Sequence, residues 1–312
     1  MDAHAIKISV AEVILDVEIE GSFKSIFELL NSFKEENNLK PVARIIIKKS
    51  DKRLVIVSDD NREITISGKD IDDLRNPFNL IGILQALFRF AGIHSVAKGI
   101  YLLHGSAAVF NGHTICFGDD GTSTAKTLSS IECGLESKEY IGDEFCFFDA
   151  NSGMVFSYSI IPVHLRPEVE KHLRNKHKFI PPDSQYKKSS AGIFIDPELM
   201  FRVIKQKKLD MLVFTHFHKR KPQIRRLTPK ESRQAAIVCL TAHLLKLLHP
   251  ELDRMKFANQ EDSDDPVKYR TRIKETLEMF PSLAGAAKDL AERVPCYRIY
   301  AHQPCDILEL LK

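Results

Sequence analysis

The sequence predicts an α/β protein, and three observations support this class. Short runs rich in β-branched residues, which are typical of strands, recur along the whole chain. Segments whose apolar residues follow helical spacing stand between these runs. One buried-strand pattern continues through a glycine-containing loop directly into a helix, which is the order found in α/β folds that bind phosphates.

Residues 1–80 predict a small N-terminal α/β or α+β domain. Its strand patterns are AIKISVAEVILDVEIE, ARIIIKK, RLVIVS and REITIS. The stretch SFKSIFELLNSFKEE, between the first two patterns, has helical spacing and begins at Ser22, a candidate N-cap. The polar segment SGKDIDDLRNP separates this region from the next one, so we expect a domain boundary near residue 80.

Residues 81–312 form the second predicted domain. An apolar helix, PFNLIGILQALFRFAGIHS, leads into buried strands with the sequences IYLLHGSAAVF, TICFG, EYIGDEFCFFD and MVFSYSII. The helix AKTLSSIECGLES follows TICFG directly. After residue 170 the chain becomes helical and polar, and we expect two later strands, LDMLVFTHF and VPCYRIYA, and two later helices, ESRQAAIVCLTAHLLKLL and DILELL.

The composition is that of a globular protein. Of the 312 residues, 44% are hydrophobic and 28% are charged, and the net charge of +3 does not require a nucleic-acid or membrane partner. The N-terminal residues lack the basic start and apolar run of a secretory signal, and no uninterrupted apolar stretch approaches about 20 residues. The six cysteines show no C-x-x-C pair. We therefore expect a cytoplasmic protein with reduced thiols and no membrane partner.

The segment FGDDGTSTAKTLSSIE, residues 117–132, contains the parts of a phosphate-binding loop. Such a loop needs backbone N–H groups at a helix N-terminus, a lysine for the β- and γ-phosphates and a hydroxyl for Mg²⁺. Lys126 would supply the cation and Thr127 the hydroxyl. The pattern departs from G-x-x-x-x-G-K-[ST] because Ala125 replaces the second glycine and Gly118 precedes the lysine by eight residues. The candidate nucleotide contacts before the lysine are Gly118, Gly121, Thr122, Ser123, Thr124 and Ala125.

Two acidic residues complicate this interpretation of the loop. Asp119 and Asp120 carry negative charge that opposes a polyphosphate unless Mg²⁺ or distance intervenes. The segment could instead be an acidic turn before a helix that Ser123 or Thr124 caps. The loop alone therefore leaves both interpretations open.

The residues on either side of the loop resemble a known family. LLHGSAAVFNG, the loop, YIGDEFCFFD and IIPVHLRP match in order and spacing the HPr kinase/phosphorylase-related P-loop kinases, whose nucleotide core also resembles phosphoenolpyruvate carboxykinase. Members tend to show a His-Gly strand, the loop with its helix, and a strand ending in two acids. His104 and Gly105 take the first position, and Asp143 and Glu144 take the last. The interval of 17 residues from Lys126 to Asp143 matches the family, which favours Lys126 as the phosphate lysine.

The resemblance covers residues 100–168 and implies roles for several side chains. Asp143 would accept the proton of the attacking hydroxyl and Glu144 would bind metal, although glutamate in place of the second aspartate leaves these two roles exchangeable. His104 would orient or tune Asp143, or it is a buried structural histidine. Arg166 would hold a substrate or phosphate oxygen, or it is a solvated surface residue. The family's phosphorylase activity and protein substrate have no matching motif in this chain.

A basic cluster, HFHKRKPQIRR, occupies residues 216–226. His216 and His218 would share one face of a strand, as metal ligands can, but no third ligand stands nearby in sequence. The basic residues could contact RNA, an anionic substrate or a protein, although a solvated loop is the commonest explanation for such a run. These residues are Lys219, Arg220, Lys221, Arg225 and Arg226.

We therefore expect a P-loop kinase core of the HPr kinase and phosphoenolpyruvate carboxykinase type, with a helical C-terminal part. It would use Mg²⁺ and ATP, or another nucleoside triphosphate, to phosphorylate a hydroxyl of a small molecule, a peptide or protein serine, or a nucleic acid. A homo-oligomer is compatible with this expectation. The alternatives are an inactive nucleotide-binding sensor or scaffold, and an RNA-binding protein that uses residues 216–226.

Overall fold

The computed structural model describes most of the chain as a mixed α/β protein, which confirms the predicted class. The described residues are 3–21, 23–37, 39–52, 54–121, 125–177, 186–189, 192–217, 221–249 and 266–312. They form two compact units, and each unit is drawn from two separate stretches of sequence. The first unit comprises residues 1–100 and 243–279, and the second comprises residues 101–242 and 280–312. Residues 81–100 and 243–279, which the sequence assigned to the second domain, thus lie in the first unit.

The first unit is built on a five-stranded sheet in the order β1-β2-β3-β5-β4. The strands β2, β3 and β5 are parallel, whereas both edge strands are antiparallel to their neighbours. The strands are β1 (Ala3–Val10), β2 (Val13–Glu20), β3 (Ala43–Lys49), β4 (Leu54–Val57) and β5 (Glu63–Gly68). The helices are α1 (Lys24–Asn31), α2 (Pro77–Ser95), the 3₁₀ turn η1 (Val96–Lys98) and α6 (Pro266–Met279).

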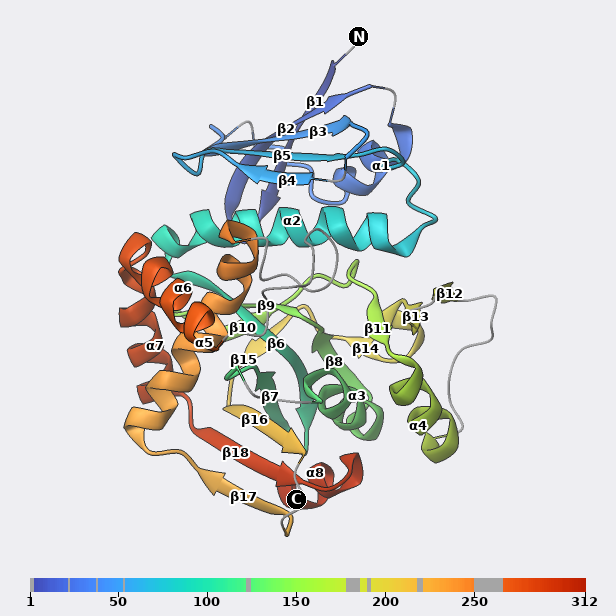
Figure 1. Ribbon diagram of the computed structural model, residues 1–312. Coiled ribbons are helices and arrows are strands. Elements are labelled where there is room, and N and C mark those ends of the chain that lie inside the picture. The colour runs from blue at the N-terminus through green and yellow to red at the C-terminus, as the bar shows by residue number, and fades with distance from the viewer. Residues whose placement is uncertain are drawn as a thin grey trace. The chain divides into compact units, whose positions relative to one another are not determined.

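Alternation in β3 explains how this sheet acquires one covered face. Ile45 and Ile47 are buried, whereas Arg44 is exposed and forms ion pairs with Glu18 and Glu63 on the two neighbouring strands. A strand places successive side chains on opposite faces, so one face packs inward and the other carries charge. The helix α2 lies along one face of the sheet (Figure 1).

One helix of the described chain, Phe78–Lys98, is long and apolar enough to cross a membrane by length and composition. The most apolar 18-residue segment of this helix has a mean hydropathy of 1.5, and 83% of that segment is buried in the fold. Buried core helices of globular proteins pass the same test, since a helix that is apolar on all sides belongs in a core or in lipid. The side chain of Asn76 caps this helix by accepting the Phe78 N–H at 3.0 Å, and Pro77 occupies its first turn.

The second unit is built on a ten-stranded mixed sheet. Its main path is β15-β10-β9-β6-β7-β16-β18-β17, with β8 paired to β6 and β14 paired to β8. The strands are β6 (Ile100–Phe110), β7 (His113–Gly118), β8 (Glu139–Gly142), β9 (Phe145–Asp149), β10 (Met154–Phe156), β14 (Arg202–Val203), β15 (Gln206–Lys208), β16 (Met211–Phe217), β17 (Gln223–Arg226) and β18 (Cys296–Ala301). A separate three-stranded sheet contains β11 (Val163–Leu165), β13 (Gly192–Ile195) and β12 (Tyr186–Ser189).

Helices cover both faces of the central sheet in this unit (Figure 1). On one face lie α3 (Lys126–Ser137) and α8 (Pro304–Leu311), and on the other lie α5 (Pro229–Leu248) and α7 (Ser282–Arg293). The helix α4 (Pro167–His177) and the 3₁₀ turn η3 (Pro197–Leu199) complete the unit. The core beneath α3 and α8 is fully buried and includes Phe117, Ile131, Val213, Ile299 and Ile307.

A buried carboxylate joins α3 to α4. Glu132 is wholly buried, and its two oxygens lie 2.8 Å from His172 Nε2 and 2.7 Å from Lys176 Nζ. Since His172 and Lys176 are one helical turn apart, both reach the same carboxylate from one face of α4. A buried charge is tolerated when it is paired in this way.

The arrangement of β7, β16 and β18 locates a candidate site. These three strands are parallel and adjacent, so their carboxyl ends meet at one edge of the sheet. In open α/β sheets ligands bind in the crevice beyond the carboxyl ends of parallel strands. The loop after β7 leads directly into α3, as the sequence predicted.

Candidate functional site

The candidate phosphate loop joins β7 to α3. Gly118 ends β7 in a crowded position, because an added Cβ would lie 3.0 Å from Phe214 and 3.1 Å from Cys239. Gly121 has a φ of 86°, in the left-handed region that favours glycine, and its N–H donates to Asp119 Oδ1 at 2.8 Å. The candidate contacts Thr122, Ser123 and Thr124, including the two candidate caps, lie outside the described residues.

Lys126 is the first residue of α3 and lies between two polar partners. Its Nζ is 2.8 Å from His104 Nε2 and 3.4 Å from Asp119 Oδ2. The other ring nitrogen of His104, Nδ1, is 2.9 Å from the same oxygen of Asp119. His104, Asp119 and Lys126 therefore form a closed group, which we call the loop cluster.

The register of β6 against β7 creates the contact between His104 and Asp119. These strands form a hairpin in which Phe110 pairs with His113 and Gly105 pairs with Gly118. One step beyond that last pair, His104 stands opposite Asp119, and the Asp119 N–H donates to the His104 carbonyl at 3.0 Å. The two-residue turn between the strands is Asn-Gly, a sequence that specifies a tight hairpin.

The contacts of His104 determine which nitrogen carries its proton. A lysine ammonium group has donors only, so the Nε2 atom that faces Lys126 accepts a hydrogen bond. The ring proton then lies on Nδ1, which is 2.9 Å from the carboxylate of Asp119. In this tautomer the Nε2 lone pair faces the lysine of the loop.

The carboxylate of Asp119 is held in its ionised form. Burial by itself raises the pKa of Asp119, but the hydrogen bond from His104 and the positive charge of Lys126 outweigh this effect. The pKa of Asp119 therefore lies well below its ordinary value. Asp119 acts as the counter-ion of Lys126.

Asp120 is bound on the opposite side of the loop. Its carboxylate is 3% exposed and lies 2.7 Å from Arg298 Nη2 and 3.3 Å from His216 Nε2. Arg298 comes from β18 and His216 from the carboxyl end of β16. This pairing attaches the loop to two parallel strands, and it gives His216 a carboxylate contact.

A second group of side chains surrounds Asp143, which lies in the bend between β8 and β9. Asp143 Oδ1 accepts hydrogen bonds from the Ser106 hydroxyl, from the Thr127 hydroxyl at 2.9 Å and from the Glu144 N–H at 3.0 Å. Ser106 comes from β6, which pairs with β8. We call Ser106, Thr127, Asp143 and Glu144 the strand-end cluster.

Burial controls the titration of Asp143. This residue is 4% exposed, and the loss of solvent raises its pKa to about 6, with a further contribution from the negative charge of Glu144. Hydrogen bonds from Ser106 and Thr127 act in the opposite direction. A carboxyl group that titrates near neutral pH can accept a proton from a substrate hydroxyl and release it again.

Two residues beside these clusters adopt left-handed backbone conformations. Ala125 has a φ of 60° and Glu144 a φ of 62°. Residues other than glycine are uncommon in this region, and such conformations occur often near functional sites. Ala125 stands at the position where the pattern G-x-x-x-x-G-K-[ST] has glycine, a residue that adopts this conformation readily.

The sequence left two roles open for His104, one that orients or tunes Asp143 and one as a buried structural histidine. In the structure the hydroxyls of Ser106 and Thr127 donate to Asp143. The ring contacts that fix His104 are with Asp119 and Lys126. The pairing of His104 with Asp119 could have been predicted from the Asn-Gly turn and the strand register that it sets. The sequence analysis identified neither Ser106 nor Arg298 as a site residue. The register of β6 against β7 could have placed Ser106 near the site, but it gives no information on Arg298.

Free cysteines lie beneath the loop. Cys239 donates a weak hydrogen bond to the His104 carbonyl at 3.6 Å, and burial raises the pKa of its thiol above its ordinary value. Cys116 and Cys146 interact with each other, and their hydrogen bond and burial raise the pKa of Cys116. The five described cysteines are all free and buried, as the sequence predicted.

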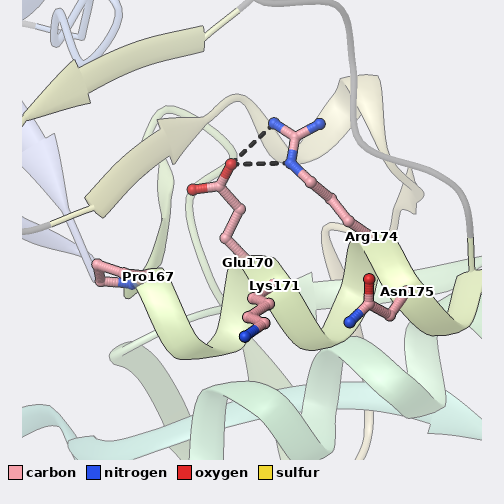
Figure 2. Close-up of a pocket in the computed structure, with 5 residues that line it drawn as sticks. All are labelled: Pro167, Glu170, Lys171, Arg174 and Asn175. Atoms are coloured by element: carbon pink, nitrogen blue, oxygen red, sulfur yellow. Dashed lines mark hydrogen bonds and ion pairs between the residues drawn. The ribbon is translucent and has the colours of Figure 1, made fainter.

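Arg166 is exposed and lies at the end of β11, directly before α4. Among the described residues, no hydrogen bond or ion pair connects it to either cluster. A pocket of about 300 Å³ adjoins this point on α4 (Figure 2), and Glu170 and Arg174 form an ion pair of 2.8 Å across it. The residues around the pocket, which include none from either cluster, are Pro167, Glu170, Lys171, Arg174 and Asn175.

The basic cluster of residues 216–226 is only partly described. His218, Lys219 and Arg220 lie outside the described residues. Arg225 forms a bidentate ion pair with Glu231, in which both nitrogen–oxygen distances are 2.9 Å. This contact gives Arg225 a partner within the protein at the start of α5.

The sequence predicted Thr127 and Glu144 as magnesium ligands, and the structure places both beside Asp143. The described part of the chain contains no group of three or more His, Cys, Asp or Glu side chains that could hold a metal. Mg²⁺ usually takes one or two carboxylates from the protein together with phosphate oxygens and water. The Thr127 hydroxyl and the Asp143 carboxylate, 2.9 Å apart, are oxygen groups of the required kind.

Comparisons with known proteins provide no family for this chain. No protein-family model matches it, and a search of curated proteins finds no similar sequence. The two clusters and their contacts are therefore the basis for inferring a function.

Proposed function

We propose that this protein binds a nucleoside triphosphate at the N-terminus of α3 and transfers its γ-phosphoryl group to a hydroxyl. One observation carries the proposal. Lys126 and Thr127 are consecutive in the sequence. The Thr127 hydroxyl donates a hydrogen bond of 2.9 Å to Asp143, a buried acid at the end of β8. Phosphate loops of this kind place a lysine on the phosphates and a hydroxyl on Mg²⁺ beside an acidic strand end.

The N-terminus of α3 provides the other part of a phosphate site. Backbone N–H groups in the first turn of a helix have no partner within the helix, and the helix dipole favours an anion there. Lys126 adds a full positive charge at the same point, with its side chain 15% exposed. A nucleotide would therefore meet both the dipole and the ammonium group.

Electrostatics favour the nucleotide as its magnesium complex. Asp119 already pairs with Lys126, and Asp143 and Glu144 add negative charge near the same helix end. A free polyphosphate would be repelled by these carboxylates. Mg²⁺ would supply charge that offsets these carboxylates, and the Thr127 hydroxyl and the Glu144 carboxylate would hold it.

Asp143 is the proposed proton acceptor. A pKa of about 6 leaves most of this carboxylate ionised at pH 7, so that it can take the proton of an attacking hydroxyl. The bonds from Ser106 and Thr127 hold it in one orientation. The class of the hydroxyl-bearing acceptor stays open between a small molecule, a protein serine and a nucleic acid.

A second candidate function is nucleotide sensing without turnover. The observation that favours it is the pairing of Lys126 with Asp119 and His104, which a nucleotide must displace or share. Displacement of an internal counter-ion is a way to couple binding to a change in the loop. Binding without transfer would support this second function.

Thermal unfolding and calorimetry with ATP, GTP, ADP and pyrophosphate, each with and without Mg²⁺, test the proposal. A ligand at about 100 times its Kd stabilises the folded state by roughly 2.7 kcal/mol. We expect this stabilisation in the native protein and in the control variant Lys288→Ala, whose side chain is 62% exposed on α7. We expect its loss in Lys126→Ala. Unchanged ATP affinity in Lys126→Ala would contradict the proposed site.

A transfer assay separates the two candidate functions. Asp143→Asn should keep nucleotide binding and lose hydrolysis or transfer, because only the proton acceptor is removed. If the native protein binds nucleotide but neither hydrolyses it nor transfers phosphate, the sensor function is supported over the kinase.

A further inference from the structure

The loop cluster contains an imidazole arranged as a nucleophile. His104 Nδ1 lies 2.9 Å from the Asp119 carboxylate, and Nε2 lies 2.8 Å from Lys126 Nζ. An imidazole whose Nδ1 proton is held by a carboxylate presents its Nε2 lone pair to a reacting group. Here that lone pair faces the ammonium group that would hold the transferring phosphate.

We propose that His104 Nε2 accepts the γ-phosphoryl group of the nucleotide, so that transfer proceeds through a phosphohistidine. This inference rests on the proposed function, because it requires a nucleoside triphosphate at Lys126. The lysine of a phosphate loop contacts the β- and γ-phosphates. A ring nitrogen within hydrogen-bonding distance of the same ammonium group is therefore adjacent to the phosphorus that is transferred.

The first step forms one bond and breaks one bond. The Nε2 lone pair attacks the γ-phosphorus, and the bond from that phosphorus to the oxygen bridging the β- and γ-phosphates breaks. The nucleoside diphosphate leaves with the electron pair on that oxygen, where Lys126 offsets the charge. The Nδ1 proton remains between the ring and Asp119, whose carboxylate balances the positive charge of the phosphorylated imidazole.

The second step returns the enzyme to its starting form. The hydroxyl oxygen of the acceptor attacks the same phosphorus, and the phosphorus–nitrogen bond breaks with its electron pair returning to Nε2. Asp143 takes the hydroxyl proton. The two clusters therefore have separate roles. The loop cluster receives the phosphoryl group, and the strand-end cluster accepts the proton.

The burial of His104 supports a phosphohistidine that persists long enough to be observed. The side chain is 7% exposed, and exclusion of water slows hydrolysis of a reactive intermediate. Asp119, held ionised by His104 and Lys126, remains available as the counter-charge throughout the neutral pH range.

Single-turnover labelling tests the inference. The full-length protein is mixed with Mg²⁺ and γ-phosphate-labelled ATP or GTP without acceptor, quenched in alkali, and mapped by mass spectrometry. We expect an acid-labile, alkali-stable label on the peptide that contains His104. His104→Gln should lose it, whereas His113→Gln, which changes an exposed histidine at the start of β7, should keep it.

Asp143→Asn distinguishes a phosphohistidine from direct transfer. If transfer has two steps, this variant lacks only the group that accepts the proton in the second step. The label on His104 should then rise toward one phosphoryl group per chain. Direct transfer predicts no label in either protein. The site of the label in the native protein decides the matter even if His104→Gln does not fold.

The possible failures are distinguishable. Nucleotide binding and phosphoryl transfer without label on His104 would overturn the phosphohistidine and leave the proposed kinase intact. Absence of nucleotide binding in calorimetry would overturn both. A label on another residue, with His104 unmodified, would also contradict the assignment.

Discussion

The loop cluster contains a half-buried aspartate and the strand-end cluster a buried one, and their titrations are shifted in opposite directions. The pKa of Asp119 lies well below its ordinary value, while that of Asp143 rises to about 6. Burial raises the pKa in both cases, but Asp119 has Lys126 and His104 as close partners, whereas Asp143 is bound by neutral hydroxyls and lies near Glu144. The comparison shows that close positive partners can lower the pKa of a carboxyl group even where burial acts to raise it.

This difference suits the two proposed tasks. An aspartate that remains ionised can serve as a permanent counter-charge for a lysine and an imidazole. An aspartate that titrates near neutrality can take and release a proton. Pairs of titratable groups with pKa values shifted apart are typical of acid–base sites.

The largest expected effect comes from removing the cation of the loop cluster. Lys126→Met leaves the Asp119 carboxylate without its ammonium partner, and breaking a largely buried ion pair costs about 3 kcal/mol. We expect the free energy of unfolding to fall by that amount in urea denaturation at pH 7. The pKa of Asp119 should rise at the same time, because the charge of Lys126 lowers it.

The double variant Lys126→Met/Asp119→Asn provides the control. Removing both charges should recover part of the lost stability, with a coupling energy of about 1–3 kcal/mol in the double-mutant cycle. Additive losses in the two single variants would show that the ion pair does not contribute as the contacts indicate.

The next effect concerns pH dependence at Asp143. Its folded-state pKa of about 6 exceeds the value of about 3.9 in an unfolded chain, so the folded protein binds more protons between these values and stability falls as pH rises through this range. Asp143→Asn removes this loss and should raise the free energy of unfolding by about 3 kcal/mol at pH 7. Near pH 4 the difference should vanish.

The variant Asp119→Asn provides a second test. The difference between its free energy of unfolding and that of the native protein should have the opposite sign to the difference for Asp143→Asn. The pKa of Asp119 is lowered on folding, so its contribution to stability is present above the unfolded value and is lost as pH falls. Asp119→Asn should therefore be less stable than the native protein at pH 7, and the two should converge in acid. Parallel pH profiles for the two variants would contradict the comparison.

The smallest effect comes from removing one hydroxyl donor. Ser106→Ala deletes a hydrogen bond to Asp143 that lowers its pKa, so this pKa should rise further, by up to about one unit, at a cost near 1 kcal/mol in stability. Carboxyl NMR titration of Asp143 measures the shift. Ser137→Ala, which removes a hydroxyl bonded to the Val109 carbonyl, should lose stability without moving that pKa.

Much of the fold was predictable because its longer elements carry strong patterns. The strands from β1 to β9 and the helices α2, α3, α5 and α8 lie where the sequence placed them. The structure adds β11 to β15, β17, α6 and α7, and the strand expected at residues 154–161 is only Met154–Phe156. Most of these strands have two to four residues, too few for alternation to be recognised.

The sequence predicted individual residues of the candidate site better than it predicted the contacts between them. Lys126, Thr127 and Asp143 were identified from spacing, and the structure brings Thr127 and Asp143 together. The partner of His104 depended on strand register, which the Asn-Gly turn specifies. Arg298 could not be paired with the loop from sequence, because that contact depends on the order of the parallel strands β16 and β18, which 78 residues separate.

That strand order also determines when the site can assemble during synthesis. In the sheet β18 lies between β16 and β17, yet Ala301 at its end is made 84 residues after Phe217 at the end of β16. At about 5–20 residues per second, β16 and β17 wait roughly 4 to 17 seconds for the strand that joins them. Arg298, the partner of Asp120, arrives with that strand. The loop between β7 and α3 therefore gains this contact only after β18 has been synthesised.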